Sequence, residues 1–206
     1  MAPRTDEQNA SLREVSRAKI VETALELFAQ HGYEATSVRM IAHAAGVAQG
    51  LLYNYFASKE ILLATIVQQS MADVRASFVS AEDQTDAHGQ IERLIRVAFA
   101  TIRRKRTFWK LIYGVRMQGA VVASLGDVYI AGSAEIRATI ERYCRTAGLP
   151  RPEIEGAILF ALIDGVAQHY VLDPENYPLD AVTETLVARY KHLLAKQGGD
   201  NGTGVA

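Results

Sequence analysis

The 206-residue chain lacks the features on which several classes of protein depend. Its single cysteine, Cys144, excludes an intramolecular disulfide and a thiolate cluster, which fits a reducing cytoplasm. No apolar run approaches the roughly 20 residues that span a membrane. The first 17 residues are polar and lack the apolar core of a secretory signal. We therefore expect a cytoplasmic protein without membrane contact.

Catalytic and metal-binding patterns are also missing. No two of the five histidines have the i, i+4 spacing of a helical metal site. No glycine-rich phosphate loop follows a strand, because no clear strand pattern exists. Asp164 and His169 lie on one expected helix, where a five-residue separation places them about 140° apart. We expect no enzyme, no metal and no cofactor.

Positive charge is not in excess either. The formal net charge is −1, and residues 1–60 carry six Lys and Arg against seven Asp and Glu. A protein that coats DNA through bulk charge is thereby disfavoured. A few well-placed DNA contacts remain compatible with this balance, and their modest affinity per subunit would require dimerisation.

Residues 36–60 carry the most informative pattern. Two short helices are expected on either side of Gly46, where a sharp reversal needs the positive φ that glycine adopts at low cost. This is a helix-turn-helix, whose second helix enters the DNA major groove. We expect that helix, about 49–55, to pack against other helices through Leu52 and Phe56. Its outward face carries amide and phenol side chains, and a glycine that lets the backbone come close to DNA. The predicted DNA contacts on this face are Gln49, Gly50, Leu51, Tyr53, Asn54 and Tyr55.

Five residues around this unit are possible DNA contacts, and all except Lys59 also have a structural interpretation. Thr36 or Ser37 caps the preceding helix, and either hydroxyl could also touch a phosphate. Arg39 could reach a guanine or a phosphate, or be a solvated surface residue. Tyr55 could contact DNA or pack on the core. Lys59, at the start of the helix capped by Ser58, could form a phosphate site with the N-terminal amides of that helix.

The run VRMIAHAAGVAQGLLYNYFASKEILL resembles the DNA-binding signature of the TetR family of bacterial transcriptional regulators. One departure is Ala48, where the family often has a serine that caps the recognition helix. The resemblance covers residues 16–62 well and the remainder loosely. It implies a dimer that binds a pseudo-palindromic double-stranded DNA operator and is released by a small-molecule effector.

The rest of the chain is expected to be helical, giving an all-α fold of about nine helices. We predict a flexible arm at 1–15, the DNA-binding domain at 16–60, a ligand-binding and dimerisation domain at 61–197 and a disordered tail at 198–206. A loop is expected at 81–89, and the basic run at 103–106 is interpreted as a solvated helix end. Two apolar stripes, at 152–172 and from 178 or 179 onward, predict a homodimer interface; alternatively they complete the monomer core.

An apolar or aromatic effector is expected to bind a pocket with a few polar groups. Its predicted lining residues are Phe99, Trp109, Tyr113, Arg116, Met117 and His169. Each could instead be a core residue, and Arg116 could extend to water. The alternative function is an all-helical small-molecule carrier or protein-interaction module without specific DNA binding.

Overall fold

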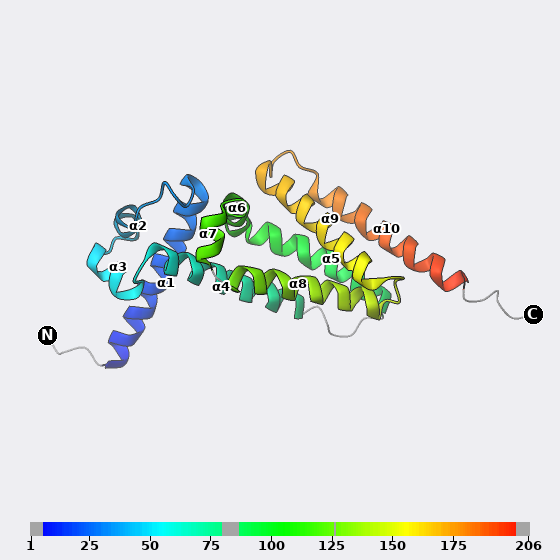
Figure 1. Cartoon of the computed structure of the whole chain (residues 1–206), viewed down its shortest axis with the longest axis horizontal. Coiled ribbons are helices and arrows are strands. Elements are labelled where there is room, and N and C mark those ends of the chain that lie inside the picture. Colours follow the sequence, from blue (N-terminus) through cyan, green and yellow to red (C-terminus); the bar gives the residue numbers. More distant parts are fainter. Residues whose placement is uncertain (1–5, 80–86, 126, 201–206) are drawn as a thin grey trace, which may run out of the picture. The chain divides into compact units, whose positions relative to one another are not determined.

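A computed structural model describes residues 6–79, 87–125 and 127–200. Within these residues the chain forms ten helices and no strand, which confirms the all-α prediction with one helix more than the nine expected (Figure 1). The helices are α1 (Asp6–His31), α2 (Val38–Ala45), α3 (Gln49–Tyr55), α4 (Lys59–Val79), α5 (Ala87–Arg104), α6 (Arg106–Val115), α7 (Gly119–Ser124), α8 (Asp127–Thr146), α9 (Pro152–Leu172) and α10 (Leu179–Asp200).

The chain divides into two compact units. The first combines Met1–Ser70 with Lys110–Tyr129, and the second combines Met71–Trp109 with Ile130–Ala206. The sequence predicted two continuous domains with a boundary near residue 60, whereas each unit here is built from two segments. The functional division into a DNA-binding and an effector-binding domain stays a prediction.

Helix α1 begins ten residues before the start expected at Ser16. The Ser16 hydroxyl donates a hydrogen bond of 2.9 Å to the Leu12 carbonyl, so this serine lies inside the helix and is not its cap. Residues 4–31 contain neither glycine nor proline, so no residue there opposes a continuous helix. The flexible-arm prediction is therefore wrong for residues 6–15, while residues 1–5 lie outside the described part of the chain.

A glycine and a buried threonine close the end of α1. Gly32 has a φ of 86°, a left-handed conformation that glycine adopts without strain. The fully buried Thr36 hydroxyl lies 2.8 Å from the Gly32 carbonyl and 3.2 Å from the Leu27 carbonyl. Ser37 instead caps α2, since its hydroxyl accepts a hydrogen bond from the Met40 amide. Ser37 is therefore the cap, and Thr36 belongs to the preceding turn.

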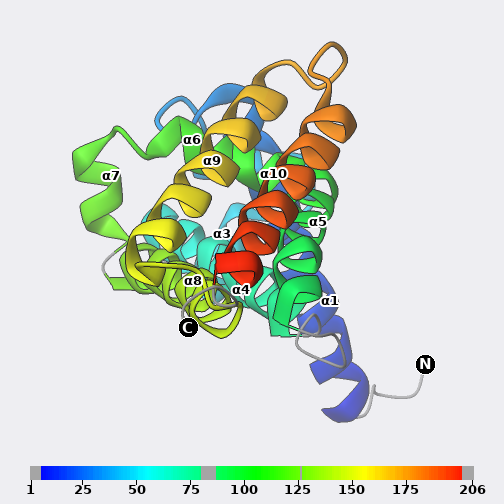
Figure 2. The ribbon, with the colours of Figure 1, turned by 90° about the vertical axis from the view of Figure 1, so that its right-hand side faces the viewer.

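In the second unit, α5 packs against both α9 and α10, and Figure 2 shows these three helices side by side. The buried side of α5 is apolar and includes Ile91, Leu94, Ile95, Ala98 and Phe99. Arg96 joins α5 to α10 through two hydrogen bonds to the Glu184 carboxylate, the longer of them 2.8 Å. Periodic apolar residues thus build the core, and a bidentate ion pair marks its edge.

Three other predicted boundaries differ from the structure. The helix expected at 121–147 is two helices, because α7 ends before Gly126 and α8 begins at Asp127. Helix α5 begins at Ala87, inside the expected 81–89 loop, of which residues 81–86 lie outside the described chain. Helix α10 continues to Asp200, so residues 198–200 are helical and not a disordered tail.

One described helix, α9, is long and apolar enough to cross a membrane by length and composition alone. A third of its most apolar stretch is buried within the protein. Helices that are apolar on several faces also occur in the cores and interfaces of water-soluble proteins. The apolar character of α9 is thus weak evidence for a membrane span.

Candidate DNA-recognition surface

The turn between α2 and α3 has the geometry that the sequence predicts. Gly46 follows α2 with φ 68° and ψ 33°, and its amide donates to the His43 carbonyl. The Val47 amide then donates to the Ala42 carbonyl at 3.0 Å, which completes a Schellman-type helix end. Ala42 and Ala45 are buried, as a close crossing of two helices requires. A left-handed glycine therefore reverses the chain between two short helices.

Helix α3 is attached to the protein by few contacts. Leu52 is its one buried residue among seven, and Phe56, the residue that follows the helix, is buried as well. The Arg17 guanidinium of α1 lies 5.2 Å from the centre of the Phe56 ring. At its other end Ala48 offers no side-chain cap, as its methyl group predicts. Packing at one residue and at one end thus holds a helix too short to be stable alone.

The outward face of α3 is exposed along its whole length. Tyr53 is 46% exposed and Leu51 38% exposed, while Tyr55 is half-buried. A Cβ atom at Gly50 would meet no atom within 4 Å, so the fold itself does not require glycine there. The exposed residues of α3 are Gln49, Gly50, Leu51, Tyr53 and Asn54. Five of the six residues predicted to face outward are therefore together on one open surface.

The two predicted contacts on the α2 side are exposed as well. Arg39 lies in the first turn of α2, next to Ser37. The Ser37 hydroxyl is occupied as a helix cap, and this serine is nevertheless exposed to solvent. Both residues are available to a phosphate, and their contacts with DNA stay a prediction.

Lys59 has a structural role that the sequence did not reveal. Its ammonium group donates to the carbonyls of Tyr33, at 3.0 Å, and Thr36, at 3.3 Å, and lies 4.2 Å from the Tyr33 ring centre. It thereby ties the start of α4 to the turn between α1 and α2. Two of its three N–H groups serve the fold, so a phosphate contact by Lys59 stays a prediction.

Glu60 completes this cluster. The Tyr33 hydroxyl donates to its carboxylate at 3.2 Å. Burial, followed by the charge of Glu60, raises the pKa of the Tyr33 phenol, which therefore stays protonated and remains a donor. A hydrogen bond from Ser58, and then one from its own backbone amide at the start of α4, lower the pKa of Glu60. The sequence pattern did not predict that Tyr33, Lys59 and Glu60 interact, because Lys59 and Glu60 lie 26 and 27 residues after Tyr33 in the chain.

The six predicted pocket residues do not share one compact unit. Phe99, Trp109 and His169 belong to the second unit, and the other three belong to the first. Phe99 is buried, whereas Met117 is 89% exposed. The Arg116 guanidinium lies 5.2 Å from the Tyr113 ring centre, and the His169 ring stacks on Tyr177. Their role in effector binding stays a prediction.

Among residues 6–79, 87–125 and 127–200, no group of three or more His, Cys, Asp or Glu side chains is arranged to hold a metal ion. Burial raises the pKa of the Cys144 thiol to about 11, so its reactive thiolate is disfavoured at neutral pH. Cys144 accordingly behaves as a small apolar core residue.

Two short helices around a left-handed glycine, the second with an open polar and aromatic face, define a helix-turn-helix DNA-binding regulator. Comparison with known proteins identifies the family. Residues 20–66 match the model of bacterial regulatory proteins of the tetR family, and residues 87–195 match the C-terminal model of BetI-type transcriptional repressors. The chain belongs to the TetR family and is a DNA-binding transcriptional repressor, not an enzyme.

Individual regulators are similar to this chain in sequence or in fold. The chain is 25% identical over 189 residues to the HTH-type transcriptional regulator PksA of Bacillus subtilis, covering 89% of this chain and 92% of PksA. Its fold is similar to that of the regulator FadR of Bacillus subtilis in complex with stearoyl-CoA, with a TM-score of 0.69, 18% identity and coverage of 84% and 96%. A putative regulator of Saccharomonospora viridis in complex with choline gives a TM-score of 0.70, 21% identity and coverage of 87% and 97%. The family membership favours the regulator over the alternative of a helical carrier.

Proposed function

We propose that the protein represses transcription as a homodimer, with one α3 helix in each of two successive major grooves of a pseudo-palindromic operator. The observation that carries this proposal is the open face of α3, where Gln49, Tyr53 and Asn54 are exposed around a glycine. Amide side chains recognise adenine, tyrosine hydroxyls reach phosphates, and Gly50 admits a close approach of the backbone. Two such helices must lie about 34–36 Å apart to meet successive grooves.

The apolar side of α9 and α10 supports dimerisation. A groove of about 370 Å³ runs between these helices and is lined by Leu162, Val166, Ala181, Val182, Thr185, Leu186 and Arg189. Next to it along α9, Ile154 and Ile158 are each 45% exposed, at a spacing of one helical turn. An exposed apolar patch on two neighbouring helices suits a two-fold interface with a second copy. The substitution Ile158→Lys is therefore expected to weaken self-association at least about tenfold, as measured by sedimentation equilibrium.

A small molecule is proposed to release the repressor from DNA. The solved relatives in complex with stearoyl-CoA and with choline contain ligands of very different size and charge, so the fold does not determine the chemistry of the effector. Phe99 and Trp109 of the predicted pocket are the best placed for an apolar effector, because they belong to one unit and are buried or half-buried. Such coupling is reciprocal: an effector that weakens operator binding must bind less tightly when the operator is present. We place the protein in the cytoplasm, where the operator DNA lies.

The experiment that tests this function is selection of binding sites from random DNA duplexes, followed by fluorescence anisotropy across a salt series. We expect a palindromic site and a tight complex. Asn54→Ala should relax the preference at one base pair of each half-site, whereas Arg39→Gln should weaken binding uniformly and reduce the salt slope by about one. A selection that yields no common sequence would contradict the proposal.

A further inference from the structure

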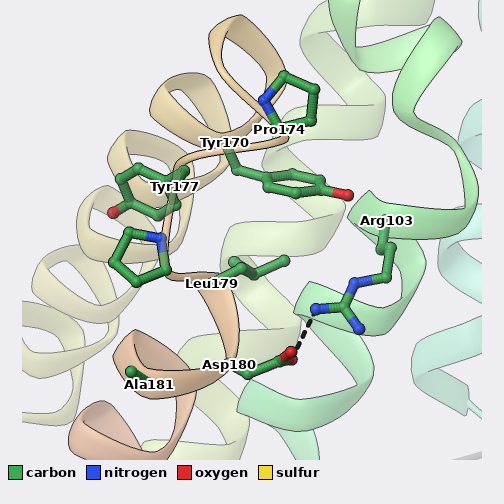
Figure 3. A pocket seen from close by; sticks show the side chains of 8 residues that line it. Arg103, Tyr170, Pro174, Tyr177, Leu179, Asp180 and Ala181 are labelled. Carbon is green, nitrogen blue, oxygen red and sulfur yellow. Dashed lines mark hydrogen bonds and ion pairs between the residues drawn. The ribbon is translucent and has the colours of Figure 1, made fainter.

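A second pocket lies where the end of α5, the end of α9 and the start of α10 meet. Its volume is about 300 Å³, and Figure 3 shows its main walls. They are formed by Arg103, Tyr170, Pro174, Tyr177, Leu179 and Asp180. None of the six residues predicted for the effector pocket lines it. The pocket lies wholly within the second unit.

The walls of this pocket are held by the turn between α9 and α10. The Tyr177 amide donates to the Asp173 carbonyl at 3.0 Å, and the Leu179 amide donates to the Tyr177 carbonyl at 2.8 Å. The Tyr177 ring is stacked on His169, with ring centres 6.1 Å apart and planes within 6°. Tyr170 and Leu179 are buried. The cavity is thus pre-formed, and a ligand would need little ordering of the protein.

One fixed positive charge faces the pocket. Arg103 donates to the Asp180 carboxylate at 2.6 Å, and the Tyr170 hydroxyl points toward Arg103 (Figure 3). This ion pair is exposed, at 51% for Arg103 and 86% for Asp180, so it contributes little to stability. Arginine has five N–H donors in a planar fork and remains charged at any physiological pH. Arg103 can therefore exchange Asp180 for another carboxylate at low cost.

We propose that this pocket binds a small planar carboxylate with one ring, whose carboxylate replaces Asp180 on Arg103. The ring would lie beside Tyr170, Tyr177 and Pro174, whose rings line the pocket. A bidentate guanidinium–carboxylate pair supplies orientation, and the cavity size suits a ligand of this class. Asp180 then acts as an internal competitor. A cationic ligand is disfavoured because the Arg103 guanidinium, which donates to the Asp180 carboxylate at 2.6 Å, would repel it.

Three probes of the same shape and different charge test this site on the full chain: benzoate, benzamide and benzamidinium. Titration calorimetry should detect benzoate binding, weaker benzamide binding and no benzamidinium binding. Preference for benzamidinium, or no benzoate binding at concentrations of about 10 mM, where single-ring ligands with ordinary efficiency still bind, would overturn the proposal. The test involves no DNA, so its result is independent of the proposed operator binding.

Substitutions of the two partners have opposite predicted effects. Arg103→Gln should weaken benzoate binding about tenfold or more, because a charge-assisted pair is lost. Asp180→Asn should tighten binding about threefold or more, since a neutral amide competes poorly for the guanidinium. Arg103→Lys keeps the charge without the fork and should bind with intermediate affinity. Benzoate binding that survives Arg103→Gln, or that is lost in Asp180→Asn, would contradict the assignment.

Arg96→Gln is the matched control. Like Arg103, Arg96 joins α5 to α10 by an ion pair, in this case with Glu184, but it does not line the pocket. Its substitution should leave benzoate binding unchanged. Melting temperatures of all four variants verify that the fold is retained, so that loss of binding reports on the site.

Discussion

Helices α3 and α9 expose surfaces of opposite chemistry. Helix α3 has seven residues, one of them buried, and presents amides and phenols to solvent. Helix α9 has 21 residues and remains apolar on its open side, where Ile154, Ile158 and Leu172 are exposed. A polar, aromatic face suits a polyanion with hydrogen-bonding edges, and an apolar face suits another protein surface. We propose that α3 binds DNA and that α9 binds a second copy of the chain.

The two helices also differ in how they are held. Helix α3 depends on one side chain, Leu52, whereas α9 buries Gly156, Leu159, Ile163, Ala167, Tyr170 and Val171. A single substitution should therefore detach α3, while α9 should be most sensitive where its backbone meets another helix.

Leu52→Ala should give the largest loss of stability. The side chain is fully buried, so its truncation leaves a cavity and should lower the free energy of unfolding by about 3 kcal/mol. Urea unfolding followed by circular dichroism measures this change. Leu51→Ala, in the same helix but exposed, should change stability by less than about 0.5 kcal/mol. Equal losses in both variants would show that α3 is not anchored through Leu52.

Gly156→Ala should destabilise the contact of α9 with α8 by about 2 kcal/mol, as overpacked sites do. A Cβ atom at this position would lie 2.9 Å from the Glu141 Cα atom, and a backbone atom cannot move aside easily. Gly165→Ala, in the same helix with nothing within 4 Å, should instead be neutral or stabilising by up to about 1 kcal/mol. Thermal unfolding of the pair provides the comparison, and a stable Gly156→Ala protein would disprove the close approach.

Gly50→Ala should separate the stability of α3 from its function. The added methyl group meets no atom within 4 Å, so helix propensity should stabilise the protein by up to about 1 kcal/mol. The same methyl group should hinder the approach of the backbone to DNA and weaken operator binding. Melting temperature and anisotropy report the two effects separately. An affinity equal to that of the wild type would indicate that this end of α3 does not approach DNA closely.

Ala48→Ser should have the smallest effect, a gain of about 0.5–1 kcal/mol in stability. A serine hydroxyl can accept one of the free amide hydrogens at the start of α3, which the Ala48 methyl group cannot. Differential scanning calorimetry of Ala48→Ser and Ala48→Val distinguishes capping from a change of side-chain volume. An equal gain in both variants would exclude capping as the cause.

Local signals predicted the helix-turn-helix well. The turn at Gly46 and the bounds of α3 could be predicted from three nearby residues: Ser37, Gly46 and Leu52. Caps, glycine turns and apolar anchors of this kind act over one or two helical turns. The early start of α1 was missed, since residues 6–15 have little apolar periodicity and the cue used was a serine that lies inside the helix.

The sequence pattern did not reveal interactions between residues that are far apart in the chain. The two carbonyls that bind Lys59 lie 26 and 23 residues earlier, and Arg103 meets Asp180 across 77 residues. The basic run at 103–106 is largely exposed at the end of α5, as interpreted, and the sequence did not reveal that Arg103 and Lys105 pair with Asp180 and Asp73. The sequence feature that could have indicated the second pocket is the turn from Asp173 to Pro178, which has two tyrosines beside it.

The most direct test of the account compares operator affinity for the wild type, Tyr53→Ala and Met117→Ala by fluorescence anisotropy on the selected duplex. Tyr53 and Met117 are both exposed residues of the first unit, so neither substitution should disturb the fold. We expect Tyr53→Ala to weaken binding by about tenfold or more, as loss of a specific contact does, and Met117→Ala to have no effect. Wild-type affinity in Tyr53→Ala would contradict the claim that the exposed face of α3 recognises DNA.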